Sequence, residues 1–306
     1  MAAGVEEAGL DAIELPLADG GEGTASILRD ALGGEVRKQT ATDPLGRSLE
    51  ADYVLLEDGR AVVEVAAASG LTLVSELERD AMAATTRGTG ELIAAAAAAG
   101  AGEILVAAGG SATTDGGKGA VEALEEAEFD PTSHPITVLC DAKTSWEDCP
   151  RVFAPQKGAD PEQVSELERR LDTIASGMPR DPRGIELTGA AGGLSGGLWG
   201  WFGARLVPGA ARVLDLLGFD EALSRAACAL TGEGRIDAST VEGKLVCEVA
   251  GRCRLSAKPC LAIVGEEQLD ADQASALGIF AIREGRNPAE IKACARQLVE
   301  TTFQEG

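Results

Sequence analysis

The chain has 306 residues, of which 45% are hydrophobic and 25% charged, and this length and composition are typical of a globular protein of about two domains. Asp and Glu number 50 against 27 Lys and Arg, so the net charge is −23. This charge excludes a generally basic nucleic-acid binder and argues against adsorption to an anionic membrane surface. The 7 cysteines form no CxxC pair, which indicates reduced thiols rather than a disulfide framework or a zinc site. Because the first residues lack the basic and apolar regions of a signal peptide, the sequence predicts a cytoplasmic protein that binds neither nucleic acid nor membrane.

The first third of the chain carries a hairpin pattern. Apolar runs at residues 53–56 and 61–65 flank the sequence EDGR, and Asp-Gly is typical of the tight turn between paired strands. Antiparallel pairing here predicts a mixed α+β region. The alanine run at residues 94–99 predicts a helix, since alanine is the best helix former.

Short apolar runs without alternation follow from residue 103 onward. Branched and small side chains dominate them, as in strands that are buried on both faces of a parallel sheet. We therefore predict that these runs form one parallel sheet. The predicted strands are residues 104–108, 136–140, 227–230, 260–264 and 279–282. The predicted helices lie near residues 117–126, 240–253, 271–277 and 288–303.

The clearest helix signal is a start at residue 160. Asp160 suits the cap position, Pro161 the first turn, and Gln163 completes the spacing of a capping box. Apolar residues then recur at helical spacing as far as Ile174.

Four glycine-rich clusters stand out, at residues 19–24, 109–117, 189–197 and 231–237. The second and the fourth follow predicted strands and precede helices, which places them at the carboxyl ends of strands, where ligands bind in open α/β sheets. Glycine lets the backbone approach an anion closely and point successive amides at it. Together with hydroxyls and carboxylates, such loops suit phosphoryl transfer from Mg-ATP. A tight connection is the alternative for each loop, and neither a Walker A motif nor a GxGxxG fingerprint is present.

Several motifs in chain order resemble the type I glycerate kinase family. The likeness covers nearly the whole chain and implies ATP-dependent phosphorylation of D-glycerate to a phosphoglycerate, with the 2-position favoured. It implies a Rossmann-like parallel α/β domain intertwined with a second α+β domain, and the cofactors Mg²⁺ and ATP. The motifs are DGGEGT at 19–24, DPLG at 43–46, AAASGL at 66–71, GGSATTDGG at 109–117, CD at 140–141, FAPQKGA at 153–159, GAAGGL at 189–194 and TGEGRID at 231–237.

On this basis we expect two discontinuous domains. The Rossmann-like domain comprises residues 1–14, 84–150 and 206–306, and the second α+β domain comprises residues 15–83 and 151–205. The family pattern opens with a strand and a PDSFKGS-type loop that we expect to precede Met1 in a longer form. The sequence also departs from the family after Asp141 and between residues 124 and 136. A catalytically poor relative that binds nucleotide, a small acid or a protein partner is therefore the alternative to an active kinase.

The candidate site residues follow from these motifs. Asp115 and Asp237 are predicted to hold Mg²⁺ or to act as general base, with a helix cap as the alternative for each. Lys157 and Arg235 are predicted to balance charge on the substrates, with a surface lysine and a surface salt bridge as the alternatives. The predicted nucleotide- or phosphate-binding residues are Gly109, Gly110, Ser111, Thr113, Gly232, Glu233 and Gly234. The predicted substrate-binding residues are Asp19, Glu22 and Gln156.

Overall fold

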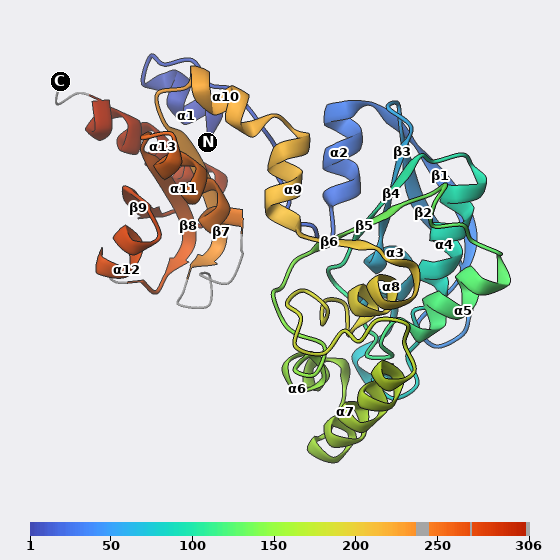
Figure 1. The fold of residues 1–306 in the computed structure, drawn as a ribbon. Helices are drawn as coiled ribbons and strands as arrows, with labels where there is room; N and C mark the ends of the chain where they lie inside the picture. Colours follow the sequence, from blue (N-terminus) through green and yellow to red (C-terminus); the bar gives the residue numbers. More distant parts are fainter. Residues whose placement is uncertain (237–244, 270, 304–306) are drawn as a thin grey trace. The chain divides into compact units, whose positions relative to one another are not determined.

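The computed structural model describes residues 1–236, 245–269 and 271–303 (Figure 1). Contacts divide the chain into two compact units, each described here by itself. Unit 1 comprises Met1–Pro16 and Leu214–Gly306, and unit 2 comprises Leu17–Val213. No helix among the described residues is long and apolar enough to cross a membrane.

Unit 2 is built on a six-stranded mixed sheet with the strands in sequence order. β1 and β2 pair antiparallel, as do β2 and β3, and each later neighbour pairs in parallel. The predicted hairpin is confirmed, because the Asp-Gly turn joins β2 to β3. The strands are β1 (Gly34–Thr42), β2 (Ser48–Leu56), β3 (Arg60–Glu64), β4 (Glu103–Ala107), β5 (Ile136–Cys140) and β6 (Arg205–Pro208).

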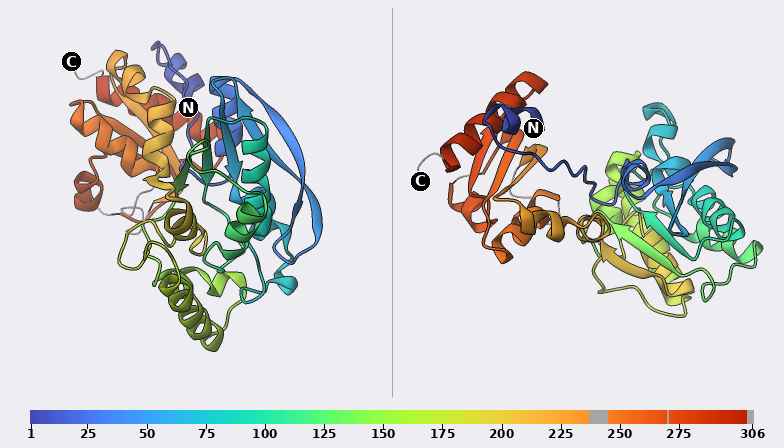
Figure 2. Two further views of the ribbon diagram at one scale, coloured as in Figure 1. Left: turned by 45° about the vertical axis from the view of Figure 1, so that its right-hand side comes forward. Right: turned by 90° about the horizontal axis from the view of Figure 1, so that it is seen from above.

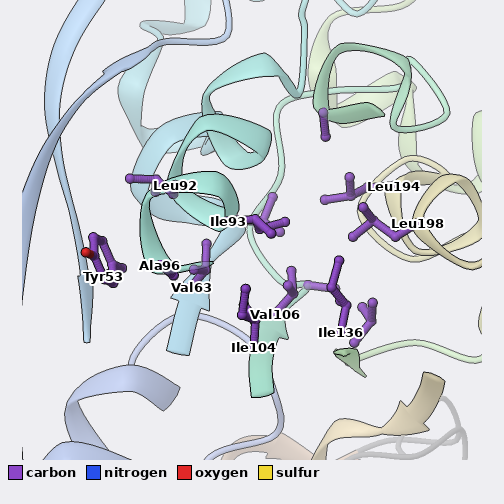
Figure 3. Close-up of a cluster of buried hydrophobic side chains, with 14 of the residues drawn as sticks. Tyr53, Val63, Leu92, Ile93, Ala96, Ile104, Val106, Ile136, Leu194 and Leu198 are labelled. Atoms are coloured by element: carbon purple, nitrogen blue, oxygen red, sulfur yellow. The ribbon is translucent and has the colours of Figure 1, made fainter. Parts of the chain in front are cut away.

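Both faces of this sheet are buried where the strands run parallel. Ile104 and Val106 of β4 face one core, in which α4 and α8 contribute Ile93 and Leu198 (Figure 3). Leu105 between them is equally buried and points to the other face, as strand geometry requires. The continuous apolar runs of the sequence are thereby explained. The helices of unit 2 are α2 (Thr24–Leu32), α3 (Val65–Ser69), α4 (Arg87–Ala98), α5 (Lys118–Glu126), α6 (Cys149–Phe153), α7 (Pro161–Ser176) and α8 (Leu194–Phe202), with short 3-10 turns η1 (Leu71–Leu73), η2 (Glu76–Glu78) and η3 (Pro155–Lys157).

The predicted cap of α7 is confirmed. Asp160 accepts a 2.8 Å hydrogen bond from the Gln163 amide, and the Gln163 side chain accepts one of 3.0 Å from the Asp160 amide. The alanine run lies in α4, also as predicted.

Unit 1 is a three-stranded parallel sheet between helices. Leu261 and Ile263 of the central strand pack against α13 and against α1, so the first and last helices of the chain lie side by side (Figure 2). α11 contacts β7 and β8. The elements are α1 (Ala2–Glu7), α10 (Phe219–Arg225), β7 (Ala229–Ile236), α11 (Leu245–Leu255), β8 (Cys260–Glu267), α12 (Ala271–Ala276), β9 (Ala281–Glu284) and α13 (Pro288–Phe303), and α9 (Gly209–Leu216) precedes α10.

The α/β fold class is confirmed, but the prediction of one parallel sheet is wrong. The runs at 104–108 and 136–140 join the hairpin strands, because β3 pairs with β4 from Arg60 to Glu64. The other three runs form the separate sheet of unit 1. The same pairing makes the compact units differ from the predicted domains, which placed residues 15–83 and 84–150 apart.

Candidate functional site

Two glycine loops meet at the carboxyl ends of the parallel strands in unit 2. The loop of residues 109–117 follows β4, Asp141 follows β5, and the loop of residues 19–23 leads into α2. A Cβ atom at Gly109 would lie only 2.5 Å from Gly21 Cα and 3.3 Å from Asp141 Oδ2. Only glycine permits this approach of one backbone to the other. The carboxyl edge of a parallel sheet is where ligands bind in α/β proteins.

Three successive backbone amides in the loop of residues 109–117 have no hydrogen-bond partner in the part of the chain that the structure describes. The Gly110 carbonyl accepts a 2.8 Å hydrogen bond from the Leu71 amide, and the Ala112 amide donates to Ser69. Among the described residues, no acceptor faces the amides of Gly109, Gly110 and Ser111. Gly110 has a left-handed φ of 69°, and free amides around such a residue form the concave nests that bind anions.

The hydroxyls of this loop are used internally. The Ser111 and Thr113 hydroxyls hydrogen-bond each other at 2.8 Å, and the Thr113 amide donates to Ser111 Oγ at 3.0 Å. Both residues are buried. The loop therefore offers a ligand its backbone amides more readily than these hydroxyls.

Asp115 is bound on all sides by hydrogen-bond donors. Its carboxylate accepts from the Thr86 amide and hydroxyl at 2.9 and 2.8 Å, and from the Gly117 and Gly119 amides at 3.1 Å. Gly117 and Gly119 belong to the start of α5, and Thr86 precedes α4. Burial nevertheless raises the pKa of Asp115. These contacts support the helix-cap alternative over the metal ligand or general base.

Lys157 lies behind the same loop and not on the surface. Its side chain reaches the Thr113 carbonyl, to which Nζ donates at 2.5 Å, and only 3% of the residue is exposed. The surface-lysine alternative is therefore wrong. Burial lowers the pKa of Lys157 to about 8, although Cys149, Asp115 and Asp141 act in the opposite direction.

The third glycine cluster, at residues 189–197, supports the loop from behind. The Gly192 carbonyl accepts a 3.1 Å hydrogen bond from the Gly116 amide. A side chain at Gly192 would collide with the Thr113 carbonyl, which is also the acceptor of Lys157. This cluster therefore supports the loop through a backbone hydrogen bond and close backbone packing.

Three carboxylates, those of Asp19, Glu22 and Asp141, lie where the loops of residues 19–23 and 109–117 approach each other. Asp19 is exposed and accepts a 3.0 Å hydrogen bond from the Gly21 amide, and the exposed Glu22 reaches towards Gly110. Desolvation of the Asp141 carboxyl, followed by the charge of Asp19, raises the pKa of Asp141 to about 6, while Lys157 acts against the rise. Asp141 is absent from the candidates drawn from the sequence. A carboxylate directly after a predicted strand was the signal that could have found it.

Gln156 takes a different position from the other predicted substrate-binding residues. It is exposed in η3, and its carbonyl accepts a 3.3 Å hydrogen bond from Arg79. The structure therefore brings Asp19, Glu22, Gly109 and Gly110 together. The hydrogen bond described for Gln156 comes from Arg79 instead.

The remaining candidates belong to unit 1, where the predicted loop is wrong from residue 231 to residue 236. β7 continues to Ile236 because its residues pair with β8 as far as Glu267. Gly232, Glu233, Gly234 and Arg235 are thus strand residues, and Arg235 donates to Gln268 at 2.8 Å. Asp237 lies outside the described residues.

A hollow of about 850 Å³ opens at the carboxyl end of this small sheet. It is lined by Gly232, Glu233 and Gly234 of β7, by Gly265 and Glu266 of β8, and by residues before and within α13. The predicted nucleotide- or phosphate-binding residues therefore fall in two places, one in each unit.

The fold and the glycine loops are those of an α/β phosphotransferase. The sequence model of the glycerate kinase family matches this chain over residues 1–149 and 130–304. The chain belongs to the glycerate kinase family, as the motifs indicated.

Individual relatives support this assignment. The chain is 36% identical to the glycerate kinase of Bacillus subtilis strain 168, over 92% of this chain and 84% of that protein. It is 34% identical to the glycerate 2-kinase of Escherichia coli K12, over 88% of this chain and 80% of the relative. The crystal structure of a Salmonella typhimurium LT2 protein assigned as glycerate kinase 2 superposes with a TM-score of 0.81 at 32% identity, covering 99% of this chain and 92% of that one.

Proposed function

We propose that this protein transfers the γ-phosphoryl group of ATP to D-glycerate, favouring the 2-hydroxyl, and releases 2-phosphoglycerate and ADP in the cytoplasm. One observation carries the proposal: in a chain of the glycerate kinase family, free amides, carboxylates and a buried lysine adjoin the carboxyl ends of parallel strands. Phosphoryl transfer depends chiefly on positioning and on charge stabilisation, and these groups supply both.

Each group has a distinct part in the proposal. The amides of Gly109 and Gly110 hold phosphate or carboxylate oxygens, and the Lys157 ammonium compensates negative charge from behind the loop. Asp19 and Glu22 accept hydrogen bonds from the glycerate hydroxyls, with Gln156 as a further polar contact.

The described residues do not form a cage that could hold Mg²⁺ without a substrate. Among them, no three potential metal-ligating side chains gather, and the carboxylate of Asp115 is already occupied by four donors. Mg²⁺ is usually held by one or two carboxylates together with substrate phosphates. In our proposal Mg²⁺ therefore arrives with the ATP phosphates.

The first prediction concerns the reaction itself. We expect ADP release that depends on D-glycerate, and little or none with L-glycerate, glycolate or D-lactate, in a coupled assay with Mg-ATP. Phosphorus NMR of the product should show the ester on the 2-hydroxyl. Absence of D-glycerate-dependent turnover would contradict the kinase proposal. A product phosphorylated on the 3-hydroxyl would contradict only the proposed preference for the 2-hydroxyl.

The second prediction concerns the hollow in unit 1, which we propose contacts the nucleotide. A Cβ atom at Gly234 would meet nothing within 4 Å, so Gly234→Ala should leave the melting temperature unchanged. Gly234→Leu should take up space beside the hollow and raise the KM for ATP about tenfold, the equivalent of about 1.4 kcal/mol, with the KM for glycerate unchanged.

Gly251→Ala serves as the control, because it also adds a Cβ in open space but lies on α11. An unchanged KM for ATP in Gly234→Leu would show that the hollow is not a nucleotide site.

A further inference from the structure

Asp141 is a carboxylate at this site to which the proposed function assigns no role. It follows β5 directly, and Gly109, whose amide is free, approaches its Oδ2 closely. The residue is exposed, and among the described residues no other side chain hydrogen-bonds its carboxylate. The Asp141 carboxylate thus lies beside the anion-binding amides without a side-chain partner among the described residues, whereas the oxygens of Asp115 are occupied.

We propose that Asp141 is the general base that accepts the proton of the glycerate hydroxyl, an inference that rests on the proposed function. As the hydroxyl oxygen forms its bond to the γ-phosphorus, its proton passes to the Asp141 carboxylate. The bond from the γ-phosphorus to the bridging oxygen breaks, and ADP leaves with that electron pair. Atoms and charge balance without any reactant besides glycerate and ATP.

The charged neighbours of Asp141 suit this part. Asp19, on the loop across the edge, opposes ionisation of Asp141, and Lys157, behind the loop, favours it. Together with desolvation of the carboxyl, which is the largest cause of the rise, these charges set the pKa of Asp141 to about 6. Asp141 is then ionised at neutral pH and more basic than an ordinary aspartate, which is the balance that a general base needs. Turnover should therefore fall as the pH drops through about 6, because protonated Asp141 cannot accept the proton.

The third prediction tests this with two substitutions. Asp141→Asn should lower kcat about 100-fold or more, the scale of a lost general base, while the KM values for glycerate and ATP and the melting temperature stay close to those of the wild type. Asp19→Asn, whatever its effect on the level of turnover, should move the acid limb of the pH profile to lower pH, because it removes the charge that raises the pKa of Asp141. Asp30→Asn, an exposed change on α2, is the control and should alter neither quantity.

The outcomes distinguish a failure of the proposed role of Asp141 from a failure of the proposed kinase activity. Wild-type kcat in Asp141→Asn, or an effect on the KM for glycerate alone, would overturn the role of Asp141 and leave the kinase proposal standing. If Asp141→Asn failed to fold, Asp19→Asn would still test the role of Asp141. An unchanged position of the acid limb of its pH–rate profile would overturn that role and leave the kinase proposal standing. A wild type without D-glycerate-dependent turnover would overturn the proposed function, and the base with it.

Discussion

Lys157→Met is expected to reduce turnover at least about 100-fold and to leave the melting temperature unchanged or higher. The ammonium is buried, and among the described residues its hydrogen bond goes to the Thr113 carbonyl and not to a carboxylate, so its desolvation costs several kcal/mol. Methionine keeps the apolar length of the side chain and removes that charge, at the cost of about 1–3 kcal/mol for the Thr113 carbonyl that loses its donor. Function and stability should therefore respond in opposite directions. Calorimetric melting and a coupled kinetic assay give the two readouts.

The pH dependence of stability provides a second check on Lys157. Since its folded-state pKa of about 8 lies below the ordinary 10.5, the folded protein releases this proton before the unfolded chain does. Between these two pH values the wild type should gain stability relative to Lys157→Met as the pH rises, while its turnover falls because the positive charge is lost. Lys118→Met, an exposed change on α5, is the matched control. A wild-type rate in Lys157→Met would show that the ammonium does not serve the reaction.

Asp115→Ala is expected to lower the free energy of unfolding of unit 2 by about 3 kcal/mol or more. Four donors at the starts of α4 and α5 lose their acceptor, and lost caps and unsatisfied buried amides cost about 1–2 kcal/mol each, without full additivity. For a unit of this size the melting temperature should fall by roughly 6–12 °C. Asp115→Asn keeps one acceptor oxygen and should show a smaller decrease.

The same two variants decide between the cap and the chemical role that the sequence suggested for Asp115. Well below the melting temperature, Asp115→Asn should keep kcat within about tenfold of the wild type, because the loop is loosened but no reacting group is lost. A 100-fold loss of kcat at an unchanged melting temperature would instead assign Asp115 to the chemistry.

Local signals in the sequence predicted local structure well. The Asp-Gly turn and the Asp160 cap depend on residues within a few positions of each other, and the structure confirms both. Sheet membership depends on pairing between distant segments. The continuous apolar pattern of residues 104–108 fits a parallel neighbour but does not say which strand that neighbour is, and β3 was assigned to another domain for this reason.

The candidate site was predicted in part for a similar reason. A glycine-rich run after an apolar run indicates a loop, and this holds after β4, whereas β7 continues through Gly232 and Gly234 because β8 supplies backbone partners. Burial of Lys157 is invisible in its sequence surroundings, since it arises from the contact of η3 with the loop after β4. Asp141 was overlooked because one carboxylate after a strand carries no spacing pattern.

The sequential strand order of unit 2 has a consequence for how the protein forms during its synthesis. Each strand from β2 to β6 lies beside the strand translated just before it, so the sheet can grow one strand at a time as the chain leaves the ribosome, where domains fold from the N-terminal side first. Unit 1 has the opposite requirement, because α1 packs on α13. Since α1 precedes unit 2 in the chain and α13 follows it, α1 must remain unpaired until α13 has been translated, and unit 2 can be complete before that happens.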